Sequence, residues 1–388
     1  MDKVRLTIEK LIWRGRGLAH LPSGQVALVE PGVYPGEEIE GFIHKAKRDY
    51  VEVSWTDVIK PHDSRRPHPC LHSRGCGGCR FGTIPQSVQL CLKKELLLNE
   101  IKRALGDETI EQVKEKIEIF PSRPGWRYRW RGQVVVYKRK PHFRQIRSHQ
   151  LIPLDDCLLF SRPLSKSLKQ ICQRLPEGKQ TVAASPFDHL ALSEHSTQSI
   201  RLPLEDYGLM LDVPPKVFFQ ANWSLNLSLI RYVCKQLMGL RSIADLYAGV
   251  GNFSLPLSRQ ADRVLAIESD SEAVIAAGEN AEKAGLNNVE FINWDVVRAD
   301  LPRLLVQYGI QALVFDPPRI GIGKGLNLVA EQPVLERIVW ISCDIVNTCR
   351  DIRPFIKAGW IIKEMALFDM FPQTWHIEVV FVLEKERG

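Results

Sequence analysis

The sequence predicts an α/β protein built from a small β-barrel, a mixed α+β region and a doubly wound parallel α/β domain. Three observations lead to this prediction. Short alternating segments fill residues 1–60, helix-type and strand-type segments mix over residues 61–205, and strands and helices alternate regularly over residues 206–388. With 388 residues, 45% of them hydrophobic, the chain has room for two or three domains.

No run of about 18 apolar residues occurs, so the sequence predicts no membrane partner. The N-terminal residues MDKVRLTIEK lack the apolar stretch of a signal peptide. We therefore expect a cytoplasmic protein, and we expect it to be a monomer. Thiols stay reduced in the cytoplasm, so the nine cysteines favour a metal or catalytic explanation over disulfides.

The first 60 residues read as four or five short strands. The segments VRLTIEKLIW, QVALVE, EEIEGFI and YVEVSW alternate in hydrophobicity, and Gly and Pro separate them. That number of strands in that length is typical of a small barrel of OB-like size. Residues 61–69, rich in Pro, His and Arg, are predicted to be a linker.

The positive charge of the chain is concentrated in one segment. Residues 121–154 carry seven Arg, two Lys and no acid, a charge of +9, whereas the whole chain carries +7. This local excess indicates a surface for a polyanion such as RNA, although a solvated basic face is an equally open interpretation.

Within the basic segment, GWRYRWRGQVVVY alternates aromatic and basic residues like a strand. We predict that the aromatic side chains face the core and that arginines on the other face contact RNA. The aromatic residues are Trp126, Tyr128 and Trp130, and the arginines are Arg127, Arg129 and Arg131.

Closely spaced cysteines occur in CLHSRGCGGC, which contains Cys70, Cys76 and Cys79 in a glycine-rich segment. Such spacing lets the chain wrap around a metal centre, and Cys157 in LIPLDDC is a candidate fourth ligand. The site would hold either a [4Fe–4S] cluster or Zn²⁺. Zinc sites more often use two C-x2-C pairs, and this segment has one.

The C-terminal part begins with a glycine-containing loop, DLYAGVGNF, directly after an apolar strand. Gly249 and Gly251 would let the backbone approach a ligand closely. Glu268 ends the next strand, where an acid usually binds ribose hydroxyls, and Asp295 ends the third. Because the motif is G-x-G without the third glycine, an adenosyl group without phosphates fits better than a dinucleotide.

Two further strand ends carry candidate functional residues. Asp316 in ALVFDPPRIG precedes two prolines, which predicts either a stiff ligand-binding loop or a structural turn. The segment WISCDIVNTCRD places Cys343 where a buried strand runs out into a loop. Cys343 is a candidate nucleophile there, and Cys349 is predicted to be a packing residue.

Together these motifs closely resemble the RNA uracil-C5 methyltransferase family, in its iron–sulfur, rRNA-modifying branch, over nearly the whole chain. The resemblance implies a TRAM domain at residues 1–60 and a central domain with the iron–sulfur site and basic RNA-binding strands at residues 61–205. It also implies a Rossmann-like class I methyltransferase domain at residues 206–388. S-adenosyl-L-methionine and a [4Fe–4S] cluster are the implied cofactors.

The resemblance also assigns roles to residues. The ISC motif implies Cys343 as nucleophile, and FDMFPQTWHIE implies Glu378 as general base. The implied cluster ligands are Cys70, Cys76, Cys79 and Cys157. The implied contacts to cofactor or substrate are Gln220 (in FFQANW), Tyr247, Gly249, Gly251, Asn252, Glu268, Asp295 and Asp316. The expected RNA contacts are Arg127, Arg129, Arg131 and Arg147.

The residue after the nucleophile departs from the family pattern. The family usually has Asn followed by Pro, whereas this chain has Asp344 and Ile345. An acid beside a cysteine should disfavour the thiolate.

The implied reaction is methylation of carbon 5 of a uridine in RNA, most readily 23S rRNA, with the uridine flipped out of a loop. A thiolate adds at carbon 6, carbon 5 takes the methyl group, and a base removes its proton. Two alternatives remain: a tRNA methyltransferase of the same fold, and a non-catalytic RNA-binding iron–sulfur protein.

Overall fold

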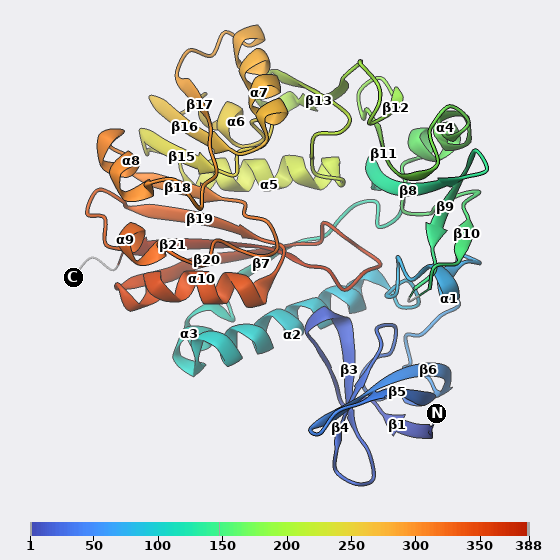
Figure 1. Cartoon of the computed structure of the whole chain (residues 1–388). Coiled ribbons are helices and arrows are strands. Elements are labelled where there is room, and N and C mark those ends of the chain that lie inside the picture. Colours follow the sequence, from blue (N-terminus) through green and yellow to red (C-terminus); the bar gives the residue numbers. More distant parts are fainter. Residues whose placement is uncertain (1, 147, 386–388) are drawn as a thin grey trace.

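The computed structural model describes residues 2–146 and 148–385. Figure 1 shows three lobes that meet near the centre of the molecule. The N-terminal lobe is a six-stranded sheet in the order β1-β5-β6-β4-β3-β2. Its elements are β1 (Lys3–Thr7), β2 (Lys10–Ile12), η1 (Trp13–Gly15), β3 (Arg16–His20), β4 (Val26–Val29), β5 (Glu38–Ala46) and β6 (Tyr50–Lys60).

This small all-β lobe matches the predicted kind of structure but has more strands than expected. VRLTIEKLIW alternates like one strand, yet the chain leaves β1 at Ile8, whose N–H donates to the carbonyl of Glu37 at 2.9 Å. The segment therefore forms two strands. The lobe has its own apolar core, in which Ala27, Val29 and Val53 are fully buried.

The predicted linker is anchored to the lobe. Glu37, fully buried, accepts hydrogen bonds from Arg65 Nε at 2.5 Å and Nη2 at 2.7 Å. Tyr34 Oη lies 2.7 Å from Thr83 Oγ1. A bidentate pair of this kind fixes orientation as well as distance, so the lobe is held against the segment that follows it.

The middle of the chain forms a five-stranded sheet, β10-β9-β8-β11-β12, covered by α4, and a separate hairpin of β13 and β14. Figure 1 shows this sheet beside the C-terminal domain. The elements are α1 (Ser73–Cys76), α2 (Gln86–Leu105), α3 (Asp107–Val113), β7 (Ile117–Phe120), β8 (Arg131–Tyr137), β9 (Lys140–Arg144), β10 (Leu151–Pro153), α4 (Arg162–Cys172), β11 (Gly178–Ala184), β12 (Ala191–Ser193), β13 (Ile200–Leu204), η2 (Glu205–Tyr207) and β14 (Leu209–Val213).

The basic segment is not the continuous strand that its alternation predicted. β8 begins at Arg131, and Arg127 has a left-handed φ of 61°. The Arg127 guanidinium pairs with Asp156, and Tyr128 is buried with its hydroxyl donating to the Pro372 carbonyl at 3.1 Å. Long-range bonds to distant loops override the local alternation here.

The C-terminal domain is the predicted α/β sheet. Its order is β17-β16-β15-β18-β19-β21-β20-β7, with β15 to β19 parallel and β21 antiparallel to both neighbours. The elements are α5 (Trp223–Gln236), β15 (Ser242–Leu246), α6 (Ser254–Leu257), β16 (Arg263–Glu268), α7 (Ser271–Lys283), β17 (Val289–Asn293), α8 (Leu301–Gln307), β18 (Ala312–Phe315), α9 (Leu326–Ala330), β19 (Arg337–Ser342), α10 (Ile345–Lys357), β20 (Trp360–Phe368) and β21 (Glu378–Lys385).

One strand of this sheet comes from far away in the sequence. β7 pairs in parallel with β20, Ile117 opposite Met365, and α2 packs along α10 (Figure 1). Residues 86–120, which the sequence prediction grouped with the central region, thus belong to the C-terminal layer. None of the helices in the described ranges combines the length and the apolarity needed to cross a membrane.

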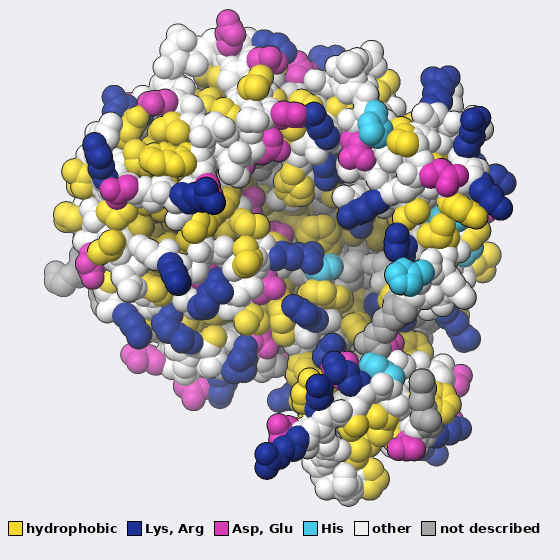
Figure 2. Space-filling model, viewed as in Figure 1, with side chains coloured by type: hydrophobic (Ala, Val, Ile, Leu, Met, Phe, Trp, Pro, Cys, Tyr) yellow, Lys and Arg dark blue, Asp and Glu magenta, His cyan; other side chains and the backbone are white. Residues whose placement is uncertain are grey.

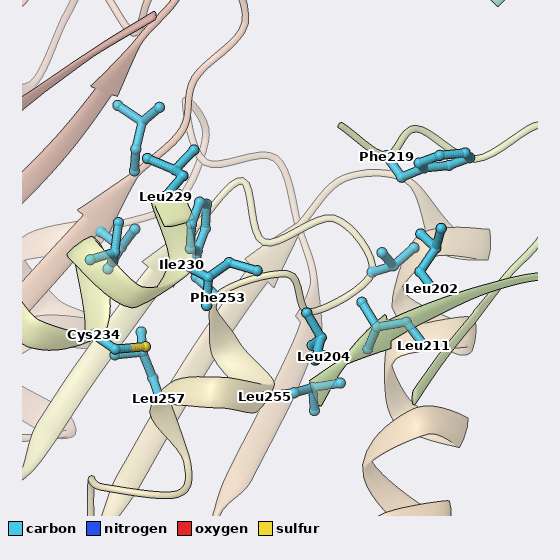
Figure 3. Close-up of a cluster of buried hydrophobic side chains, with 14 of the residues drawn as sticks. Leu202, Leu204, Leu211, Phe219, Leu229, Ile230, Cys234, Phe253, Leu255 and Leu257 are labelled. Atoms are coloured by element: carbon cyan, nitrogen blue, oxygen red, sulfur yellow. The ribbon is translucent and has the colours of Figure 1, made fainter. Parts of the chain in front are cut away.

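A buried cluster supports the loop that follows β15. Phe253, Leu255 and Leu257 pack against α5 and the β13–β14 hairpin, as Figure 3 shows. Leu255 and Leu257 are fully buried. Such close packing fixes the backbone of the loop in one conformation.

Helix α2 also holds the loop between β20 and β21. Lys93 and Asp369 form an ion pair at 2.6 Å, and both side chains are completely buried. Gln89 and Gln373 exchange two hydrogen bonds of 2.8 Å. Gln373 has φ 69°, an uncommon value for a residue with a side chain. The loop conformation therefore depends on polar groups of α2.

Removing one member of the buried pair should be costly. We expect Lys93→Ala to lower the free energy of unfolding by about 3–5 kcal/mol, because the Asp369 carboxylate stays buried without its cation. Lys94→Ala, one residue along the same helix, should change it by less than about 0.5 kcal/mol. Urea denaturation followed by circular dichroism measures both values, and equal losses would contradict the assigned role of the pair.

Candidate active site

The candidate nucleophile and base lie on neighbouring strands. Cys343 directly follows β19, and Glu378 opens β21. These strands are antiparallel with Ser342 opposite Val379, so the next pair in the register is Cys343 and Glu378. Glu378 is only 2% exposed. The pairing of the two strands thus brings together residues 35 positions apart in the chain.

A second carboxyl lies at the same edge of the sheet. Asp316 follows β18, the other neighbour of β19, and the side chain of Gln220 next to it acts to lower its pKa. Burial raises the pKa of Asp316 to about 7. Burial also raises the pKa of Glu378 well above its usual range, and the nearby Asp316 adds to this. Two carboxyls so close together resist ionising at the same time.

The Cys343 thiol shares this environment. Burial raises its pKa to about 12, with further contributions from the Glu378 and Asp316 carboxylates. The Arg319 guanidinium opposes the increase. Cys343 is consequently a protonated thiol at neutral pH, and it would need a proton acceptor to act as a nucleophile.

The unexpected Asp344 has a structural role. Its Oδ1 accepts a hydrogen bond from the Asn347 N–H at 3.2 Å, so Asp344 is the N-cap of α10. An N-cap satisfies a backbone donor at the start of a helix, and Asp and Asn serve equally well. Its charge contributes less to the raised pKa of Cys343 than Glu378, Asp316 or burial does.

The glycine-containing loop lies at the carboxyl end of β15, on the same edge as Cys343. Tyr247, Gly249 and Gly251 all have left-handed φ angles, of 69°, 55° and 86°. A Cβ on Gly251 would come within 2.8 Å of the Leu255 side chain, so a larger residue does not fit. Gly249 and Gly251 have no side chain, so a ligand could approach the backbone of the loop closely, and the predicted cofactor contact stays a prediction.

Three of the predicted cofactor contacts, Glu268, Asn252 and Asp295, lie around this loop. Glu268 Oε2 accepts from the Gly249 N–H at 3.0 Å, which joins the ends of β15 and β16. Asn252 bonds to Asn226 of α5 at 2.8 Å. Asp295 lies after β17 and accepts from the Val297 N–H at 3.0 Å. The structure thus gathers all three along one edge.

Two buried polar atoms in this region lack a hydrogen-bond partner within the described chain: Tyr247 Oη and Asp245 Oδ1. Asp245 is fully buried at the end of β15, and its other oxygen accepts from Ser254 Oγ at 2.5 Å. Burial raises the pKa of Asp245 to about 7. Buried polar atoms left unpaired are costly, so a ligand with hydrogen-bonding groups fits this position.

Comparison with known proteins decides between the families that share this fold. The profile of the tRNA (uracil-5-)-methyltransferase family matches residues 157–386, more than half of the chain. The chain belongs to this family. It is an S-adenosylmethionine-dependent RNA uracil-C5 methyltransferase, as the motifs predicted.

Individual relatives agree. The 23S rRNA (uracil(1939)-C(5))-methyltransferase RlmD of Pseudomonas aeruginosa is 30% identical, with 98% of this chain and 94% of the relative covered. An uncharacterised RNA methyltransferase of Thermotoga maritima is 28% identical over 99% of both chains. The solved tRNA (uracil-54, C5)-methyltransferase of Pyrococcus abyssi has the same fold, with a TM-score of 0.74, 21% identity, and 98% of this chain and 100% of that chain covered.

In the methyltransferase, the four predicted ligand cysteines line one cavity of about 560 Å³, between the glycine-rich segment and the end of the basic segment. Burial raises the pKa of Cys76 and Cys157, and that of Cys79 to about 12. Within residues 2–146 and 148–385, no three His, Cys, Asp or Glu side chains are arranged to hold one metal ion. The thiols converge on a space, but they do not form a compact four-ligand cage.

The predicted RNA-binding arginines differ in their surroundings. Arg127 is paired with Asp156, an acid that lies just beyond the basic segment 121–154. The buried Nε atoms of Arg129 and Arg131 lack a partner among the described residues. Arg131 also lies over the rings of Phe218 and Phe219, at 5.7 and 5.9 Å. Arg147 lies outside the described residues.

Sequence reasoning missed Arg319. It stands three residues after Asp316, and its positive charge opposes the raised pKa values of both Cys343 and Glu378. The sequence did contain a signal for this role, because Arg319 is a basic residue in the same strand-end loop as the candidate acid Asp316. Lys93 was also missed, because its partner Asp369 lies 276 residues away.

The raised pKa of Cys343 predicts an unusual pH dependence. Its alkylation by iodoacetamide should keep rising about tenfold per unit from about pH 7 to about pH 10, because only the thiolate reacts and its fraction grows until the pKa is reached. A cysteine in a short peptide should level off near about pH 8.5. Site-resolved mass spectrometry measures both rates.

Asp344→Asn serves as the companion variant. It keeps the N-cap and removes one charge, so alkylation should become modestly faster with the melting temperature unchanged. Asp344→Ala should lose about 1 kcal/mol of stability. A plateau near about pH 8.5 in the wild type would refute the assigned environment of Cys343.

Proposed function

We propose that this methyltransferase modifies carbon 5 of a uridine in 23S rRNA through a covalent Cys343–uracil adduct. The observation that carries the proposal is the pairing of the half-buried Cys343 with the buried Glu378 on adjacent antiparallel strands, next to Asp316 and Gln220. The rRNA assignment rests on the similarity to RlmD over 98% of the chain.

The chemistry accounts for the residues. The Cys343 thiol gives its proton to a neighbouring carboxylate, for which Asp316 is the candidate. Sγ then bonds to carbon 6 of uracil, and the electrons of the carbon 5–carbon 6 double bond move toward the carbonyl at carbon 4. When bound, S-adenosylmethionine supplies the methyl group that the electron-rich carbon 5 accepts. Glu378 then removes the carbon 5 proton, the double bond re-forms, and the bond to Sγ breaks.

The electrostatics suit this division of roles. A raised pKa makes Glu378 a stronger base toward a carbon acid than a solvent-exposed carboxylate. The Arg319 charge stabilises a thiolate at Cys343 and the negative charge that develops on the ring. The cofactor would be held by the loop of Tyr247, Gly249 and Gly251, where Tyr247 Oη lacks a partner among the described residues.

Replacing the hydrogen at carbon 5 with fluorine should trap the adduct. RNA carrying 5-fluorouridine at the target should form a complex with wild-type protein that survives denaturing electrophoresis, because Glu378 cannot remove fluorine. Cys343→Ala should give none, whereas Cys349→Ala should behave as wild type. Glu378→Gln should accumulate adduct on ordinary RNA, because proton removal is the step it blocks. A stable fold without any adduct would favour a non-catalytic RNA-binding protein.

The RNA itself is identified by mapping 5-methyluridine in a strain that lacks the gene. We expect loss at one or two 23S rRNA positions and no change in tRNA. The fold likeness to a tRNA methyltransferase makes tRNA the alternative, and loss at a tRNA site alone would overturn the rRNA assignment.

We further propose that Cys70, Cys76, Cys79 and Cys157 hold a [4Fe–4S] cluster. Zinc would require the sulfurs to converge within about 2.3 Å of one ion, whereas a cluster fills a wider space with its ligands around it. The cavity lined by all four thiols supports the cluster. When bound, the metal would keep these buried thiolates deprotonated.

Iron analysis tests this assignment. Protein purified without oxygen should be brown and contain about four iron atoms per chain. Cys79→Ser should lose iron and colour, and Cys91→Ser, on the exposed side of α2, should keep both. Zinc-loaded protein free of iron would rule out the cluster.

A further inference from the structure

A second hollow lies beside the active site, and we call it the arginine recess. It encloses about 290 Å³ and is lined by Arg80, Arg129 and Arg319, by Gly77 and Gly78, and by Phe371, Thr374, Trp375 and His376. Figure 2 shows basic side chains around the central hollow where the three lobes meet. Arg129 and Arg319 also line the larger cysteine cavity, so the two spaces adjoin.

The recess is strongly positive. Three guanidinium groups line it, and no carboxylate does so within the described chain. Arg319 forms no ion pair with a described acid, and Arg129 has a buried Nε without a hydrogen-bond partner. Arg127, two residues away, is by contrast neutralised by Asp156. Arg129 and Arg319 are costly in this concave site unless an anion joins them.

The positive charges around the recess also act on His376. Burial lowers its pKa to about 3, and the charges of Arg319, Lys93 and Arg129 lower it further. His376 is therefore neutral at pH 7, and it offers a hydrogen bond without adding charge.

Aromatic rings form one wall of the recess. The rings of Trp375 and His376 lie 3.8 Å apart at 34°, and Trp13 meets Trp375 edge to face at 5.8 Å. Gly15 allows this contact, since a Cβ there would come within 2.5 Å of Trp375 Cβ. The N-terminal lobe thus fixes a flat wall beside the arginines, a combination suited to a nucleotide.

We propose that the arginine recess binds the phosphodiester next to the flipped uridine. The proposal rests on the proposed function, since it assumes that the substrate is RNA held at Cys343. Guanidinium groups bind phosphate oxygens in pairs, and a space slightly below the usual range of about 300–1,000 Å³ for small-molecule sites suits one phosphate and its sugar. Arg319 would then join the two sites, because it lines the recess and also acts on the Cys343 thiol.

The first test measures the salt dependence of RNA binding. A fluorescein-labelled oligouridylate of 12 nucleotides is titrated by fluorescence anisotropy at several KCl concentrations, using wild type, Arg129→Gln, Arg319→Gln and the double variant. Each lost phosphate contact should reduce the slope of log Kd against log salt by about 0.7–1 and weaken binding about tenfold. Arg259→Gln, an exposed arginine elsewhere on the C-terminal domain, should match wild type.

The second test fixes the register of the RNA. The same oligonucleotide carries one 5-fluorouridine, with or without an uncharged methylphosphonate beside it, and adduct formation is followed with S-adenosylmethionine present. The methylphosphonate should slow trapping about tenfold in wild type at limiting RNA, with little further effect in the double variant.

The outcomes separate the two proposals. Unchanged salt slopes in both arginine variants, with normal melting temperatures, would overturn the recess. Loss of iron in Arg129→Gln with an unchanged slope would assign that arginine to the cysteine site and would also overturn it. Absence of any adduct in wild type would reject the proposed function, whereas the anisotropy slopes would still report on the recess.

Discussion

The pairing of β21 with β19 is the constraint on which the site depends. It places Glu378 opposite the residue that follows β19, and it does so through backbone hydrogen bonds rather than side-chain contacts. A one-residue slip would turn Glu378 to the other face of the sheet. The fully buried Val380 and Val382 on one face and Phe381 on the other make such a slip expensive, because apolar side chains would exchange environments.

The loop between β20 and β21 connects this pairing to the rest of the molecule. Helix α2 binds it through Lys93 and Gln89, the basic segment through Tyr128, and the N-terminal lobe through Trp13. Three regions distant in sequence therefore converge on one loop. The arginine recess and Glu378 are consequently parts of the same packed unit, in which displacing one member disturbs the others.

Charges of opposite sign act on the Cys343 thiol. Asp316 and Glu378 oppose the ionisation of Cys343, and Arg319 favours it. Cys343 is thus protonated at neutral pH, and a protonated thiol reacts slowly with oxidants and alkylating agents.

The sequence by itself determined the family, the α/β order of the C-terminal domain and the small β lobe. Those features depend on local alternation and on short motifs such as DLYAGVGNF and WISCDIVNTCRD, whose residues stay together in space. The sequence also predicted that Cys343, Glu378 and Asp316 belong to one site, and the strand order places all three at one edge of the sheet. Their catalytic roles, like the cluster assignment, remain predictions.

Only the tertiary structure decided the pairings between distant residues. Asp156 neutralises Arg127. Strand β7 joins a sheet whose next strand in the chain, β15, begins 122 residues after β7 ends. Lys93 pairs with Asp369, which lies 276 positions away. Asp344, which in the sequence is only a departure from the family pattern, is the N-cap of α10 in the structure. Composition and periodicity describe what a residue is and what stands near it in the chain, whereas charge neutralisation and burial depend on what folding brings within a few ångströms.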